Sequence, residues 1–150
     1  MSAQILQAAR RPVRWTFEGI TGPAGCPTVS WCGGGCDTAP AGASNVLHGR
    51  MIANAFHGDV LVLSVDVWQV KAVTPWRESG DLFYPNDDEA PRVRVFQYSP
   101  NEGDAGDLSL AVPDAVTLVG MLRATGADQL ADAIQNAVNL AAAIAVGVRS

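Results

Sequence analysis

The sequence is poor in positive charge and has no long apolar run. It contains a single lysine, Lys71, and nine arginines against 15 acidic residues, which leaves a net charge of -5. Nucleic acids and anionic lipid surfaces are bound mainly through clustered positive charge, and no such cluster occurs. No stretch has the roughly 18 apolar residues that a transmembrane helix needs. We therefore expect neither a nucleic-acid nor a membrane partner.

The first eleven residues lack the pattern of a secretory signal, because Arg10 and Arg11 follow the apolar residues instead of preceding them. This predicts that the protein lies in the cytoplasm, a compartment in which disulfides are rare. The preference for arginine over lysine and the abundance of alanine, valine and glycine are typical of GC-rich genomes such as those of actinobacteria and their phages. A phage-encoded protein would lie in the host cytoplasm or the virion.

Cysteine is scarce but concentrated. All three cysteines lie between Cys26 and Cys36, and His48 follows twelve residues later. Zinc in structural sites takes four thiolate or imidazole ligands in a tetrahedron, so Cys26, Cys32, Cys36 and His48 form a candidate Cys3His site for a structural zinc. The glycines at 33–35 would let the backbone turn both flanking sulfurs toward one ion. His57 is the substitute ligand if His48 points away.

Two other interpretations of this segment stay open. Five residues separate Cys26 from Cys32, which is wider than the usual ligand pair of a zinc knuckle. The cysteines could instead be buried thiols packed near Trp31, since cysteine is among the most often buried residue types. They could also form one disulfide with one thiol left over, because their number is odd.

The hydrophobic pattern predicts an α+β fold in one domain over residues 1–150. Alternation of apolar and polar residues favours strands at 13–18, 59–71, 92–99 and 107–112. We expect a small antiparallel sheet that includes a cross-strand pair between Asp66 and Arg94. Residues 20–57 form an irregular Cys/His-rich segment in this prediction, and 59–112 form the sheet. The expected core residues are Leu61, Leu63, Val65, Val95, Leu110, Val119, Leu122, Leu130 and Ile134.

Two helices are predicted in the C-terminal third, at 113–126 and 127–146, and they should cover one face of the sheet. Thr125 and Asp128 have the spacing of a capping box for the second helix. From Leu140 to Val146 every residue is apolar. A helix that is apolar all round must be buried, so either the sheet or a second copy of the chain covers this end, which predicts a possible homodimer.

The long stretch from Thr74 to Pro91 joins two predicted strands and carries Trp76, Phe83 and Tyr84 among acidic residues. A loop of this length in a compact domain is commonly functional or disordered. Its aromatic side chains would either pack on the domain as a lid or anchor a partner protein.

The Cys-Pro-x-x-x-Trp-Cys segment at 26–32, the later His48, a strand that opens with Pro-Arg-Val and a terminal alanine-rich helix resemble a family of small uncharacterised actinobacterial and actinophage proteins. Its usual motif is Cys-Pro-x-Trp-Cys followed by a histidine. The resemblance covers residues 26–143 loosely, and this chain departs from it by extra residues before Trp31 and by the added Cys36. The family implies no established activity.

Three classes of function are compatible with these features. The first is a non-enzymatic protein-interaction or regulatory module that a structural metal site stabilises, and it is the one we expect. The second is a structural subunit such as a phage virion protein, which the apolar terminal helix suggests. The third is a cysteine-dependent enzyme with Cys32 as nucleophile and His48 or His57 as base.

Overall fold

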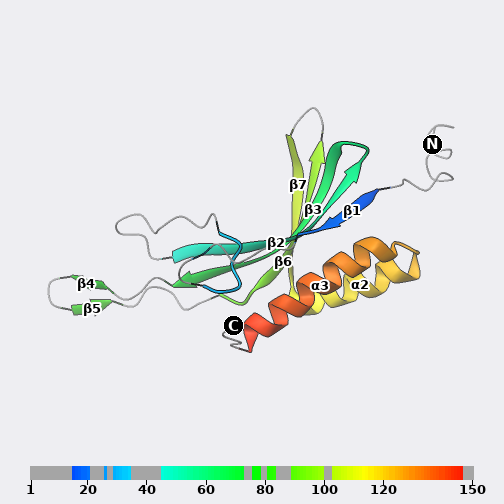
Figure 1. Cartoon of the computed structure of the whole chain (residues 1–150). Coiled ribbons are helices and arrows are strands. Elements are labelled where there is room, and N and C mark those ends of the chain that lie inside the picture. The colour runs from blue at the N-terminus through cyan, green and yellow to red at the C-terminus, as the bar shows by residue number, and fades with distance from the viewer. Residues whose placement is uncertain are drawn as a thin grey trace.

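The structure is a computed structural model of the 150-residue chain, and it shows a curved antiparallel sheet with two helices on one face (Figure 1). It describes residues 15–20, 26, 29–34, 45–72, 76–78, 81–83, 89–99 and 103–146. This architecture confirms the predicted α+β fold. The first two residues of the strand predicted at 13–18 lie outside these ranges.

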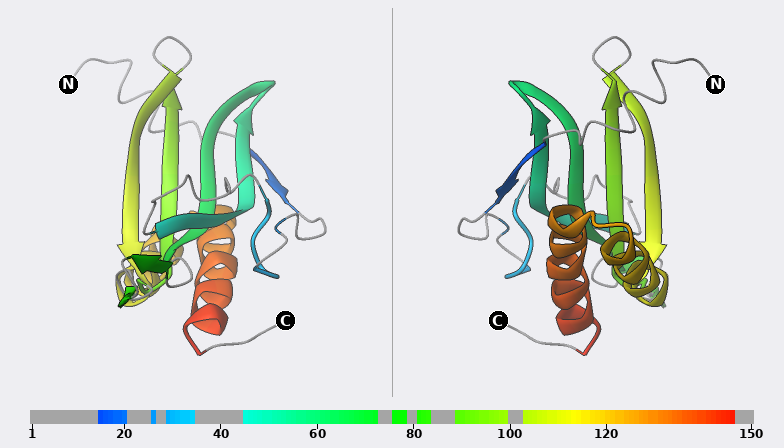
Figure 2. Two further views of the ribbon diagram at one scale, coloured as in Figure 1. Left: turned by 90° about the vertical axis from the view of Figure 1, so that its left-hand side faces the viewer. Right: turned by 90° about the vertical axis from the view of Figure 1, so that its right-hand side faces the viewer.

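Five strands form the sheet in the order β1-β2-β3-β6-β7, with every neighbouring pair antiparallel. Their bounds are β1 Thr16–Gly19, β2 Asn45–His57, β3 Val60–Ala72, β6 Arg92–Ser99 and β7 Gly103–Ala111. β3 lies at the centre of this order, with α3 packed against it, and β1 and β7 lie at the two edges. The views in Figure 2 show β2 and β3 bending together along their length.

β2 corrects the prediction that residues 20–57 are irregular throughout. It is a 13-residue strand with two register shifts against β3, between Met51 and Ala53 and between Ala55 and Phe56. At the first shift Ile52 is an extra residue, so the core-facing positions change from even to odd numbers along the chain. A strand with such a bulge shows no unbroken alternation, and the sequence pattern therefore did not reveal it.

The predicted loop at Thr74–Pro91 contains two short strands instead of continuous coil. β4 (Trp76–Glu78) pairs with β5 (Asp81–Phe83) in an antiparallel two-stranded sheet. Among the described elements, β4 and β5 contact only each other. Figure 1 shows this hairpin projecting away from the helices.

The two helices are α2 (Val112–Ala124) and α3 (Asp128–Ala145), and they pack against each other and against the sheet. α3 contacts β1, β2, β3 and β6, whereas α2 contacts β6 and β7. Figure 2 shows both helices on the same side of the sheet. Neither helix in the described part of the chain is long and apolar enough to cross a membrane.

A Schellman turn separates the helices, and it replaces the predicted capping box. The amide of Gly126 donates to Arg123 O at 3.1 Å and the amide of Ala127 donates to Leu122 O at 2.9 Å. Gly126 has φ +82°, the left-handed conformation that this motif places after a helix. The Thr125 hydroxyl donates back to Leu122 O, so α3 begins without a side-chain cap.

The core lies between the helices and β1, β2, β3, β6 and β7. Eight of the nine predicted core residues belong to it: four are buried and four are partly buried against the cluster. Leu61 is the exception. Val62 is the extra residue at the second register shift, so Val62 packs on the core in place of Leu61.

The apolar end of α3 is covered by the sheet on one side. Ala141 is fully buried, and Leu140 and Ile144 pack against the core. Ala142 and Val146 remain exposed. The structure therefore supplies a covering surface for this helix end without a second copy of the chain.

Candidate metal centre

The candidate site lies along the outer edge of β2, just beyond the point where β1 ends. The amide of Ile20, which follows β1, donates to Ile52 O at 2.9 Å. Further along, the amide of Gly33 donates to Gly49 O at 2.9 Å. Because β1 is only four residues long, the rest of this strand edge is available to the cysteine segment.

A tight turn shapes the cysteine segment at residues 29–34. The amide of Cys32 donates to Val29 O at 3.3 Å, and Gly34 adopts φ +94°, a conformation that favours glycine. Arg50 Nη1 donates to Trp31 O at 3.4 Å. Together with the Gly33–Gly49 bond, these contacts hold Trp31 and Cys32 over the strand that carries His48.

Three potential metal ligands converge there. Cys26 Sγ lies 3.6 Å from His48 Nδ1, and the ligand atoms of Cys26, Cys32 and His48 all lie within 4.8 Å of one another. Cys32 is fully buried, His48 is 5% exposed, and Cys26 is half-buried. The Trp31 ring lies edge-on to the His48 ring with centroids 6.4 Å apart, and it shields the imidazole from solvent.

The separation of Cys26 and His48 agrees with shared zinc coordination. Bonds of about 2.3 Å to sulfur and about 2.0–2.1 Å to nitrogen at a tetrahedral angle place the two ligand atoms about 3.6 Å apart. The same separation also suits a hydrogen bond between a thiol and an imidazole. Thiolate and imidazole are ligands that zinc prefers, so the donor chemistry fits this metal.

The other predicted site residues fall elsewhere. Cys36 lies outside the described residues, so its position relative to the cluster is not assigned. His57 is exposed and lies nine residues beyond His48 at the other end of β2, so it does not join Cys26 and Cys32. Within the described residues, no disulfide joins Cys26 to Cys32.

Sequence reasoning missed Gln69, which lies directly opposite His48 in the β2–β3 pairing. Gln69 is buried, with 7% of its surface exposed. Only the register of the two strands brings it beside the histidine. The alternating pattern of β3 could have flagged it as a polar residue on the core-facing side of the strand.

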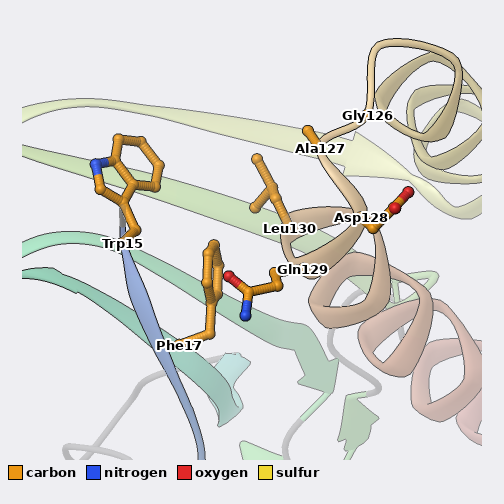
Figure 3. A pocket seen from close by; sticks show the side chains of 7 residues that line it. All are labelled: Trp15, Phe17, Gly126, Ala127, Asp128, Gln129 and Leu130. Carbon is orange, nitrogen blue, oxygen red and sulfur yellow. The ribbon is translucent and has the colours of Figure 1, made fainter. Parts of the chain in front are cut away.

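A second concave feature lies at the other end of β2, between β1 and the start of α3. It is a groove of about 490 Å³ lined by Trp15, Phe17, Gly126, Ala127, Asp128, Gln129 and Leu130. Figure 3 shows Phe17 beside Gln129 and Leu130, with the Asp128 carboxylate directed away from Trp15 and Phe17. The lining contains neither cysteine nor histidine, so the groove provides no nucleophile–base pair of the kind expected for the enzyme alternative.

Comparisons of this chain with protein-family models, with curated proteins and with solved structures find no match. The resemblance to actinobacterial and actinophage proteins therefore remains an expectation.

Proposed function

We propose that Cys26, Cys32 and His48, with Cys36 as the fourth ligand, bind one structural zinc ion, and that the protein is a non-enzymatic interaction or regulatory module. The observation that carries the proposal is the 3.6 Å separation of Cys26 Sγ from His48 Nδ1 next to the buried thiol of Cys32. Thiolates and imidazoles are the ligands that structural zinc sites use, and two thiols and an imidazole are gathered here.

Burial of the ligands supports a structural role for the ion. Cys32 and His48 have almost no exposed surface, and Trp31 is only 8% exposed. A site filled by four protein ligands leaves no position for a water molecule or a substrate, whereas catalytic zinc keeps one open. The zinc would therefore stabilise the fold and would not activate a nucleophile.

The ion would fasten the cysteine segment to an otherwise open strand edge. Beyond β1, the edge of β2 presents backbone groups that could pair with other chains, and native proteins cover such edges. The bond from Gly33 to Gly49 supplies one such cover. A zinc ion bound by Cys32 and His48 would cross-link the covering segment to β2 and fix the surface that this segment presents to a partner.

The test is the metal content of protein purified without chelator. We expect one zinc ion per chain by elemental analysis, and loss of the zinc in the Cys32→Ser and His48→Ala variants. His57→Ala is the matched control, because His57 is exposed at the far end of the same strand and should keep the full zinc content. A wild-type protein without metal, or equal loss in both histidine variants, would contradict the proposal.

The contact between Cys26 and His48 also supports a second candidate, a cysteine-dependent enzyme. A thiol within hydrogen-bond reach of an imidazole can be activated as a nucleophile. Cys26 suits this role better than the predicted Cys32, because Cys26 is partly exposed whereas Cys32 is fully buried. Rapid alkylation of Cys26 by iodoacetamide in the zinc-treated protein, reduced by His48→Ala, would favour this candidate, since a zinc-bound thiolate is protected.

A further inference from the structure

Gln69 faces the candidate zinc ligand His48 across the β2–β3 ladder. The two residues are direct register partners, and each has 7% or less of its surface exposed. The pair formed by Arg50 and Val67 is their neighbour on the same side of the two strands. Directly opposed residues in an antiparallel pair have Cβ atoms about 4.5–5.5 Å apart, which puts the two polar side chains within reach of each other.

The amide of Gln69 is held in one orientation. Its Nε2 donates to Glu89 O at 2.9 Å, and the Glu89 amide in turn donates to Val70 O at 2.9 Å. Because a carbonyl oxygen can only accept, Gln69 must direct Nε2 toward Glu89 and Oε1 elsewhere. Oε1 is buried and has no hydrogen-bond partner within the described part of the chain. A buried acceptor without a hydrogen-bond donor destabilises the fold, so a donor is expected nearby.

His48 can supply this donor from Nε2 when its Nδ1 binds the metal. Nδ1 is the nitrogen that faces Cys26 Sγ. Coordination through Nδ1 requires a neutral ring whose proton is on Nε2, and metal-bound histidines almost always donate this second N–H to a nearby acceptor. Such a donor bond fixes the orientation of the ring and makes the ligating nitrogen more basic.

We propose that, in the zinc-bound protein, Gln69 Oε1 accepts a hydrogen bond from His48 Nε2–H and thereby selects the tautomer that presents Nδ1 to the metal. Gln69 is then a positioning residue of the zinc site, held in place by Glu89. This inference rests on the zinc site proposed above. It assigns a role to the unsatisfied oxygen of Gln69 and to the direction of the His48 ring.

The test compares zinc affinity in the wild type, Gln69→Leu and Gln69→Glu by competition with a chromophoric chelator. Both variants lose the bond to Glu89 O, but only Gln69→Glu retains an acceptor opposite His48. Removing the outer partner of a ligating histidine lowers metal affinity by about 10–100-fold, so we expect a loss of this size in Gln69→Leu and a smaller one in Gln69→Glu. Equal affinities in wild type and Gln69→Leu would overturn the proposal.

A second measurement does not depend on a variant folding correctly. In ¹H–¹⁵N spectra of the zinc-loaded wild type, His48 should show a metal-bound Nδ1 and a protonated Nε2 whose hydrogen exchanges slowly. A protonated Nδ1 with Nε2 on the metal would overturn the role of Gln69 while leaving the zinc site intact. A wild type that binds no zinc would overturn the site itself, and with it this inference.

Discussion

Arg94 donates to both carboxylate oxygens of Asp66 from the neighbouring strand, with Nη2 2.6 Å from Oδ2 and Nε 3.1 Å from Oδ1. The two residues are register partners on β3 and β6. The Arg94 guanidinium also lies 4.0 Å from the centroid of the Phe96 ring, which covers it from one side. This pair was predicted from the alternation of the two strands, and the structure confirms it.

The first prediction concerns the pH dependence of stability. Burial raises the pKa of Asp66 above its ordinary value of 3.8, the charge of Asp107 adds to this rise, and Arg94 only partly offsets it. At pH values between 3.8 and the raised pKa of Asp66 in the folded state, the folded chain therefore binds more protons than the unfolded chain. The stabilising contribution of Asp66 to the free energy of unfolding is thus greatest below pH 3.8 and is lost as pH rises through the folded-state pKa.

Urea denaturation of the wild type and Asp66→Asn over a pH series measures this contribution. We expect the stability of the wild type relative to the variant to increase as pH falls from about 7 to about 3.5. Asp59→Asn is the control, because Asp59 is exposed in the turn between β2 and β3. A relative stability that decreases on acidification would mean that Arg94 outweighs burial.

The second prediction separates the two charges of this pair. Arg94→Met leaves a buried carboxylate without its partner and should lower the free energy of unfolding by about 3 kcal/mol near neutral pH. The double variant Asp66→Leu/Arg94→Met should be more stable than Arg94→Met, because it removes the stranded charge. The exposed pair of Arg123 and Asp132, 2.9 Å apart, is the control, and Arg123→Met should change stability by less than about 1 kcal/mol.

The third prediction uses two glycines of the helical region that should respond in opposite directions. Gly126 has φ +82°, so Gly126→Ala should destabilise the protein by about 1–2 kcal/mol. Gly120 lies within α2 with open space around its Cα, so Gly120→Ala should stabilise it by about 0.5–1 kcal/mol. Thermal denaturation of both variants checks the signs, and destabilisation by Gly120→Ala would contradict the assigned helix.

The fourth prediction concerns removal of the metal. A chelator should increase amide hydrogen exchange at residues 29–34 and at the adjoining part of β2, because metal binding and local folding are linked. The core around Val65 and Ile134 should stay protected, since both residues are fully buried. Uniform loss of protection throughout the chain would show that the ion supports the whole domain.

The fifth prediction is the self-association expected from the apolar end of α3. The sheet covers Ala141 and Ile144 there, so a dimer would have to use the exposed Ala142, Ala145 and Val146. The Ala142→Lys/Val146→Lys variant should then change a dimer into a monomer in light scattering without loss of helix signal. A monomeric wild type would end this prediction.

Local periodicity was sufficient for the parts of the fold that have it. β6, β3 from Leu63 onward and β7 from Asp107 onward alternate regularly, and α2 and α3 repeat apolar residues at helical spacing, so their types were predictable. The pairing of Asp66 with Arg94 followed from the same alternation. β2 did not follow, because the bulge at Ile52 moves its core-facing side chains from one set of alternate positions to the other.

Residue type is enough to identify the candidate zinc ligands, because Cys26, Cys32, Cys36 and His48 have suitable donor atoms wherever they lie. The folding of the chain brings Cys26 and Cys32 to His48 and leaves His57 at the far end of β2. This meeting depends on a turn that pairs with the edge of β2 through Gly33 and Gly49. Gln69 joins the site through strand register alone. Such contacts are non-local, and no pattern of neighbouring residues encodes them.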